Sequence, residues 1–241
     1  MAKILKKKTT KKSKKVVNAQ TYIALVIDRS GSMGGLEKSV VDGINEQIKV
    51  IRKNANKGGD TFLSYIQFDD IIETVYDKVP AKKLEELTRA QYTPRGSTSL
   101  RDAILSAIQN LKETVKETDN TAYLVIVVTD GYENSSKLIS TEALAQQIKT
   151  LEATGKWTFT YMLSNIDWTQ LQGTFINNAG NAGTFTSTPV GVSRGASSIS
   201  SGVANYMSAR QVGVTNMAEF YVGTESSVLK DTNSDNKIII K

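Results

Sequence analysis

Apolar residues in this chain alternate between short continuous runs and longer segments with helical spacing. The continuous runs cover residues 21–28 (TYIALVID), 121–129 (TAYLVIVVT) and 157–163, and each is typical of a buried strand. Residues 36–53 and 100–118 instead carry apolar side chains three and four positions apart, which predicts amphipathic helices. Strands that alternate with helices predict an α/β, doubly wound fold, with a mostly parallel central sheet flanked by helices.

Shorter segments complete the predicted fold. Residues 61–68 and 71–76 are β-rich and separated by Asp69 and Asp70, which predicts a tight antiparallel pair with the two acids in its turn. Further helices are predicted over residues 80–87, 140–154 (with Ser140 as the cap and Gly155 as the stop), 167–179 and 190–206, and a short strand over residues 184–186.

The positive charge of the chain is concentrated at its N-terminus. Residues 1–15 hold eight lysines and no acid, which leaves 22 basic against 24 acidic residues in the remainder. We expect residues 1–19 to be a solvated, disordered tail; the alternative is that residues 3–15 contact nucleic acid or another polyanion. The predicted organisation is this tail, a domain over residues 20–209 and a C-terminal appendage over residues 210–241.

The absence of two residue types excludes much chemistry. The sequence contains no histidine and no cysteine, so it has no Ser-His-Asp triad, no thiol nucleophile and no imidazole or thiolate ligand for zinc. Any metal must therefore be held by oxygen, which favours Mg²⁺, Mn²⁺ or Ca²⁺. No apolar run reaches the roughly 18 residues that span a bilayer and no secretory signal is evident, so we expect a cytoplasmic protein without membrane contact.

Oxygen donors gather in three separated segments of the sequence. Asp28, Ser30 and Ser32 follow the first strand, Thr98 lies in the loop before the second long helix, and Asp130 follows the most apolar strand. In α/β folds of this kind, ligands bind outside the carboxyl ends of the strands. We therefore expect two carboxylates and three hydroxyls to meet there, as hard ligands suited to Mg²⁺.

These segments resemble a known metal site. DRSGSM at 28–33, GSTSL at 96–100 and TDGYEN at 129–134 are similar, in order and spacing, to the metal-ion-dependent adhesion site of von Willebrand factor type A domains. The resemblance covers roughly residues 20–209, and it is to intracellular bacterial and phage members. It implies that Ser30 and Ser32 bind the ion directly, Thr98 directly or through water, and Asp28 and Asp130 mostly through water.

The same resemblance implies a function in binding rather than catalysis. The sixth position on the metal would be left for an Asp or Glu carboxylate of a protein partner. The implied setting is an intracellular adaptor in a bacterial stress or AAA+-linked system. The alternative is a phage virion or assembly protein whose lysine tail contacts nucleic acid.

Enzymatic alternatives fit the residues less well. A haloacid-dehalogenase-type phosphatase needs a second Asp two positions after Asp28, where Ser30 stands, and a metal nuclease usually has several direct carboxylates. No phosphate-binding G-x-x-x-x-G-K-[ST] motif is present. The stretch from Asp231 to Asp235 matches half of a calcium-binding EF-hand loop and lacks its glycine and final Glu. Arg29 is predicted to be a solvated loop charge.

Overall fold

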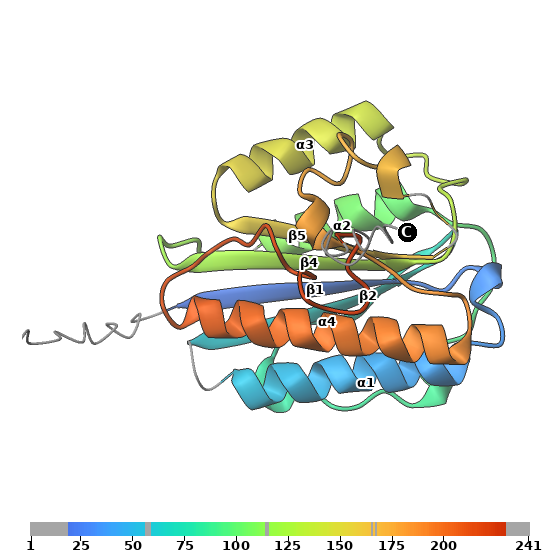
Figure 1. Cartoon of the computed structure of the whole chain (residues 1–241), viewed down its shortest axis with the longest axis horizontal. Helices are drawn as coiled ribbons and strands as arrows, with labels where there is room; N and C mark the ends of the chain where they lie inside the picture. Colours follow the sequence, from blue (N-terminus) through green and yellow to red (C-terminus); the bar gives the residue numbers. More distant parts are fainter. Residues whose placement is uncertain (1–18, 56–58, 114–115, 165, 167, 230–241) are drawn as a thin grey trace, which may run out of the picture.

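The computed structural model describes residues 19–55, 59–113, 116–164, 166 and 168–229 (Figure 1). Two predictions fall on other residues. The basic tail lies outside the described residues except for Ala19, and so does the half-match to an EF-hand loop at residues 231–235.

One sheet forms the centre of the described structure. Its strands are β1 (Gln20–Asp28), β2 (Asp60–Phe68), β3 (Ile72–Pro80), β4 (Thr121–Thr129), β5 (Trp157–Leu163) and β6 (Ala182–Thr184). They are ordered β3-β2-β1-β4-β5-β6, and every neighbouring pair is parallel except β2 and β3. The predicted mostly parallel sheet and its antiparallel hairpin are confirmed.

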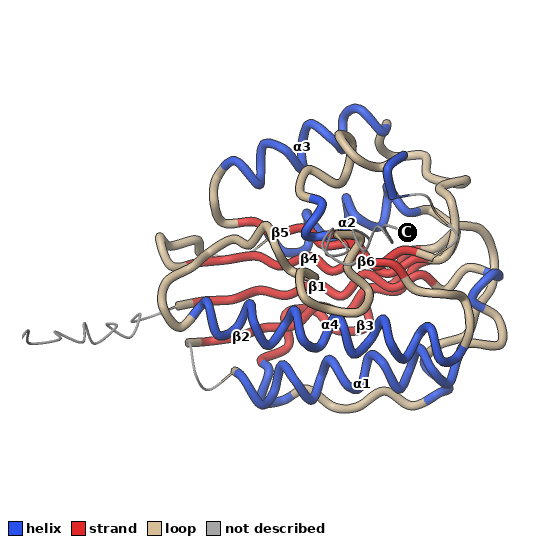
Figure 2. The backbone as a smooth tube through the Cα atoms, in the orientation of Figure 1, coloured by secondary structure: helices blue, strands red, loops and turns tan. Residues whose placement is uncertain are grey.

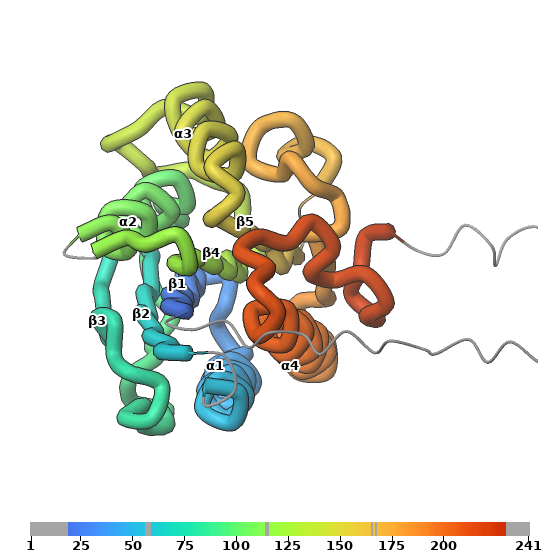
Figure 3. Tube along the Cα trace, turned by 90° about the vertical axis from the view of Figure 1, so that its left-hand side faces the viewer, coloured from blue at the N-terminus to red at the C-terminus, as the bar shows by residue number. Residues whose placement is uncertain are grey.

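Helices cover both faces of this sheet. They are α1 (Glu37–Asn54), α2 (Leu100–Lys112), α3 (Thr141–Ala153) and α4 (Pro189–Arg210). In Figures 1 and 3, α1 and α4 lie side by side on one face, and α2 and α3 lie on the other. The doubly wound α/β architecture is therefore confirmed. No helix in the described part of the chain is both long and apolar enough to cross a membrane.

The continuous apolar strands serve two cores at once. In β1, Ile23 and Leu25 pack with α1 and α4, whereas Ala24 and Val26 pack with α2 and α3. Successive side chains of a strand point to opposite faces, so a strand covered on both sides must be apolar at every position. This double burial fixes β1 and β4 side by side at the middle of the sheet, where their carboxyl ends carry the predicted site.

Some predicted helices are shorter or absent. The helix predicted over residues 100–118 ends at Lys112, just after Leu111, its last buried apolar side chain. The helix predicted over residues 80–87 is reduced to a 3₁₀ turn over Ala81–Lys83. The helix predicted over residues 167–179 is wrong, because Gly173 adopts a φ of +77° and the chain turns there.

The segment after α4 packs against the described domain. Phe220 and Tyr221 are buried in the core shared by α1 and α4. Further along, the backbone N–H of Val228 donates to the carbonyl oxygen of Ala182 at 3.2 Å, beside strand β6. Residues 211–229 therefore contribute to the core, and the predicted domain boundary at residue 209 stays a prediction.

Candidate metal site

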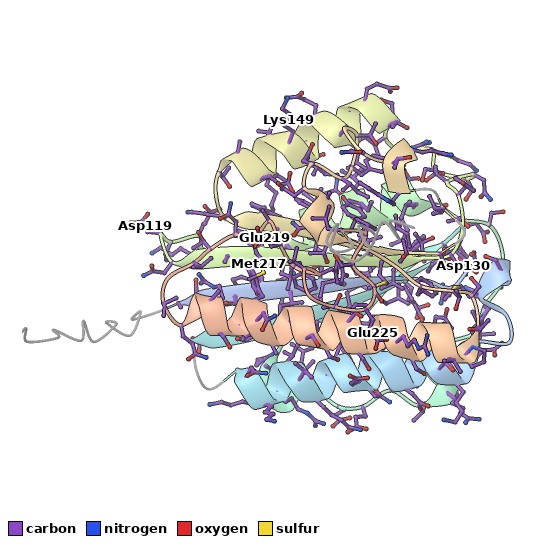
Figure 4. All side chains as sticks on the ribbon, in the orientation of Figure 1. Asp119, Asp130, Lys149, Met217, Glu219 and Glu225 are labelled. Atoms are coloured by element: carbon purple, nitrogen blue, oxygen red, sulfur yellow. The ribbon has the colours of Figure 1, made fainter. Side chains whose placement is uncertain are left out.

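The three predicted segments meet at the carboxyl edge of the sheet. Strands β1 and β4 pair in parallel with Ile27 opposite Val128, so Asp28 and Thr129 end the two strands side by side. Loops crowd this end of the molecule, at the right of Figure 2. Figure 4 shows Asp130 at this end and Asp119 at the opposite end of the sheet.

Asp28 is fully buried and both of its carboxylate oxygens are occupied. The backbone N–H of Ser30 donates to Oδ1 at 2.7 Å, and the Thr129 hydroxyl donates to Oδ2 at 2.6 Å. The Tyr92 hydroxyl donates to the carbonyl oxygen of Asp28 at 2.6 Å. Neighbours on β4 and on the loop before α2 therefore fix this residue in place.

A chain of oxygen atoms links Asp130 with the two serines. The Ser32 hydroxyl donates to Asp130 Oδ1 at 2.7 Å, and the hydroxyl oxygens of Ser30 and Ser32 lie 3.0 Å apart. Ser30 and Asp130 are buried, whereas Ser32 is exposed. The group is therefore open to solvent on the side of Ser32.

Thr98 reaches the same place from the loop before α2. A Cβ atom added to Gly131 would lie 3.1 Å from Thr98 Oγ1 and 3.7 Å from Ser32 Oγ, so both hydroxyls flank this glycine. The absence of a side chain at position 131 leaves room for them. The structure thus brings together all five predicted residues: Asp28, Ser30, Ser32, Thr98 and Asp130.

The electrostatics of this group favour a cation. Asp28 and Asp130 are buried, and no basic side chain among the described residues forms an ion pair with either. Burial raises the pKa of Asp28 to about 6, against the lowering effect of its hydrogen bonds, and the negative charge of Asp130 adds to the rise. A divalent ion would offset both the burial of the Asp28 charge and its repulsion by Asp130.

The donor set also fits a hard ion. Among the described residues, no cluster of three or more acidic, His or Cys side chains could hold a metal by itself. An ion at this site would therefore depend on hydroxyl oxygens as well as carboxylates. Hydroxyl oxygens from Ser30, Ser32 and Thr98 outnumber the two carboxylates, and all five groups are the oxygen ligands that Mg²⁺ accepts. These residues would hold the ion, which would supply a positive charge at the exposed side of the group.

Arg29 departs from its prediction. It was expected to be a solvated loop charge, but it is 4% exposed. Its Nε atom donates to Asp69 Oδ2 at 2.9 Å, and its Nη1 atom donates to Glu73 Oε2 at 2.6 Å. The prediction failed because these carboxylates lie 40 and 44 positions away in sequence, beyond any local pattern.

Asp69 does more than form the predicted turn. It makes the turn through the backbone N–H of Ile71, which donates to Oδ1 at 2.6 Å. Its Oδ2 atom also accepts hydrogen bonds from Nε of Arg29 and of Arg95, both at 2.9 Å, and its carbonyl oxygen accepts one from the Ser99 N–H. The hairpin thereby joins two of the loops that carry the site.

A second connection missing from the sequence prediction involves Glu133. Its carboxylate accepts hydrogen bonds from the backbone N–H groups of Arg101, Ser135 and Ser136. In return, Asp102 accepts hydrogen bonds from the backbone N–H groups of Lys137 and Leu138. These hydrogen bonds thus join the loop after β4 to the N-terminus of α2.

Fold and site together define a class: an α/β domain with a hydroxyl-rich candidate metal site at the carboxyl edge of its sheet. The sequence profile of the von Willebrand factor type A domain matches residues 23–190. The chain therefore belongs to the von Willebrand factor type A domain family. Domains of this family generally mediate interactions with proteins, often through a divalent metal.

Solved structures support the same fold. Proximal thread matrix protein 1 from the mussel byssus, in a form with a zinc-occupied MIDAS motif, is 20% identical with a TM-score of 0.54 over 80% of this chain and 47% of its own. A von Willebrand factor type A protein from Catenulispora acidiphila is 15% identical with a TM-score of 0.51 over 77% of this chain and 43% of its own. The chain thus spans less than half the length of these two proteins.

A third similar structure is matched over nearly its whole length. It is the vWF domain of the type V pili tip protein Mfa5 from Porphyromonas gingivalis, at 12% identity and a TM-score of 0.56 over 83% of this chain and 97% of its own. At these identities the likeness shows the fold alone. A search of curated protein sequences found no match.

Proposed function

We propose that this chain is a protein-binding module that uses one divalent ion, Mg²⁺, held by Asp28, Ser30, Ser32, Thr98 and Asp130. One observation carries the proposal: two buried carboxylates without a basic partner among the described residues lie within one group with three hydroxyls. The zinc-occupied MIDAS motif of the mussel protein supports an ion at the corresponding place in the fold. Mn²⁺ and Ca²⁺ are the other ions that such oxygens accept.

The proposed partner offers an Asp or Glu side chain to the ion. Mg²⁺ takes about six oxygen ligands, so water would fill the positions that the five side chains leave. A partner carboxylate can replace one such water on the exposed side, beside Ser32. Desolvation of both charges offsets much of this attraction, so contacts around the site must contribute the remaining affinity.

Exposed apolar side chains near the site can supply such contacts. Tyr132, 51% exposed, stands two residues after Asp130. Val190, 62% exposed, lies at the start of α4, three residues after Ser187, whose hydroxyl is 3.5 Å from Asp130 Oδ2. Aromatic and apolar anchors of this kind dominate the binding energy of protein interfaces.

The test is metal-dependent binding of an identified partner. Proteins captured on this chain in Mg²⁺ and lost in EDTA at constant ionic strength would be purified and titrated against the chain and its Asp28→Ala variant. We expect Mg²⁺ to restore binding to the chain but not to the variant, and Glu→Gln at the partner's contact to weaken it severely. Equal binding of a purified partner in EDTA would refute the proposal.

The cellular setting belongs to the same proposal. The resemblance implies a cytoplasmic adaptor in a bacterial stress or AAA+-linked system, with a non-catalytic role. The alternative setting is phage assembly, for which the eight lysines among residues 1–15 would contact nucleic acid. The identity of the purified partner distinguishes the two settings. A subunit of an ATPase complex would support the first, and a virion component would support the second.

A further inference from the structure

A polar pocket lies beside the candidate metal site. It has a volume of about 340 Å³ and is lined by Arg29, Gln67, Glu73, Val75, Ala90, Gln91, Thr93 and Arg95. Arg29 stands between Asp28 and Ser30 in the chain, and its carbonyl oxygen accepts a hydrogen bond from the Arg95 N–H at 2.8 Å. The pocket therefore shares its wall with the metal-binding loop.

The buried guanidinium of Arg29 is only partly satisfied. Its Nε and Nη1 atoms bind Asp69 and Glu73, but Nη2 is buried and has no hydrogen-bond partner among the described residues. A buried donor without an acceptor is costly, and an acceptor oxygen brought against this guanidinium would remove that cost. The arrangement therefore favours a ligand that brings oxygen.

Other donors line the same space. Arg95 uses its Nε atom on Asp69, and its side chain is 54% exposed. The Oε1 atom of Gln91 accepts the Thr88 N–H, so its amide nitrogen remains as a donor. The buried acceptor is already engaged, since Asp69 Oδ2 receives both guanidinium Nε atoms and Oδ1 receives the Ile71 N–H.

Glu73 shows which chemistry the pocket accepts. Its Oε2 atom already accepts hydrogen bonds from Arg29 Nη1 and Gln67 Nε2, yet its side chain is 52% exposed, so it can turn to solvent. The hydrogen bond from Arg29 lowers the pKa of Glu73, which keeps it ionised near neutral pH. A carboxylate from outside can replace it, because the planar guanidinium matches a carboxylate with two parallel hydrogen bonds.

We propose that this pocket is a carboxylate-binding subsite, distinct from the metal site, that accepts an Asp or Glu side chain of a protein partner through Arg29 and Arg95. Glu73 is its internal competitor. If the partner of the metal site also fills this pocket, that partner carries two acidic side chains. This last statement rests on the proposed function, whereas the subsite itself does not.

Acetate is the probe, because it reproduces the end of an acidic side chain. The whole ¹⁵N-labelled chain would be titrated with acetate in EDTA, with sodium chloride at equal ionic strength as the reference. We expect saturable shifts of the Nε–H signals of Arg29 and Arg95 and of the Gln91 amide, with no such shifts in chloride. EDTA removes the metal, so the outcome is independent of the metal site.

Two substitutions should change the affinity for acetate in opposite directions, which a merely structural role would not produce. Arg95→Gln should weaken acetate binding about tenfold, the effect of one charge-assisted hydrogen bond. Glu73→Gln should strengthen it about threefold, because a competing exposed charge is removed. Arg89→Gln removes the same charge from an exposed residue outside the pocket and should leave binding unchanged. Shifts that do not saturate, or that match those in chloride, would overturn the proposal, and so would equal affinity in all variants.

Discussion

Asn134 forms hydrogen bonds with both backbone polar groups of Thr98, the N–H and the carbonyl oxygen. Its side-chain oxygen accepts the Thr98 N–H at 2.8 Å, and its own N–H donates to the Thr98 carbonyl oxygen at 3.1 Å. The loop after β4 thus fixes the loop that carries a predicted ligand, 36 positions earlier in the chain.

Removal of the Asn134 side chain should therefore weaken metal binding indirectly. We expect Asn134→Ala to reduce Mg²⁺ affinity about tenfold, because one hydrogen bond that positions Thr98 is lost. Calorimetric titration measures this affinity. Asn177→Ala, which removes an exposed amide bound to Glu152 far from the site, is the matched control and should bind as the parent does. Equal losses in both variants would contradict the positioning role.

Gly131 offers a steric test of the same group. An alanine Cβ there would crowd Thr98 Oγ1 at 3.1 Å, whereas one at Gly31 would meet the Gly96 carbonyl oxygen at an ordinary 3.5 Å. Gly131→Ala should lower Mg²⁺ affinity by about tenfold or more, as displaced ligands do. Gly31→Ala should keep most of the affinity, and the reverse order of the two variants would count against the assigned geometry.

The raised pKa of Asp28 predicts a pH-dependent stability of the metal-free protein. An unfolded Asp titrates near ~3.9, whereas burial raises the pKa of Asp28 to about 6 in the folded state. Between these values the folded protein holds more protons than the unfolded chain, so its unfolding free energy should fall as pH rises from about 4 to about 6.

Urea unfolding in EDTA across this pH range measures the effect. The difference in unfolding free energy between the parent and Asp28→Asn, which cannot titrate, isolates the contribution of this one residue. If the parent instead became more stable relative to Asp28→Asn as pH rises, the assignment would be contradicted.

Arg210 should matter for stability but not for metal. It is 1% exposed at the end of α4, where its guanidinium donates to Thr21 Oγ1 and to the carbonyl oxygens of Gln20, Asn120 and Val214. Arg210→Met should lower the unfolding free energy by about 3 kcal/mol, because these acceptors, of which Thr21 is buried, lose charged donors.

The measurement is urea unfolding, combined with a Mg²⁺ titration that should give the parent's affinity. Arg194→Met, at a side chain that is 70% exposed, is the control and should change stability little. An equal loss of stability in both variants would show that burial of Arg210 is not the cause.

The part of this structure that could be predicted is the part with a local signal. Strand β4 is apolar at nearly every position because both of its faces are covered, and Ser140 caps α3 through the Ala143 N–H. The meeting of the five candidate residues at one edge of the sheet could be predicted because each lies at the end of a strand, in the loop after a strand or in the loop before a helix of such a pattern.

The remainder depends on contacts between distant segments. The partners of Arg29 lie on the β2–β3 hairpin, and the hydrogen bond from the Arg101 N–H to Glu133 joins residues 32 positions apart. Residues 168–179 carry apolar side chains that suit a helix, but Phe175 and Ile176 reach the core from a turn. Tertiary packing overrode the local preference there.

A calorimetric titration of the metal-free chain with Mg²⁺ tests the central claim most directly, with Asp130→Ala beside Asp119→Ala. Asp130 is buried at the carboxyl edge of the sheet, and Asp119 is exposed at the opposite end (Figure 4). We predict one divalent site in the parent and in Asp119→Ala, and at least about tenfold weaker binding in Asp130→Ala. A chain that binds no divalent ion, or an Asp130→Ala variant that binds as the parent does, would contradict it.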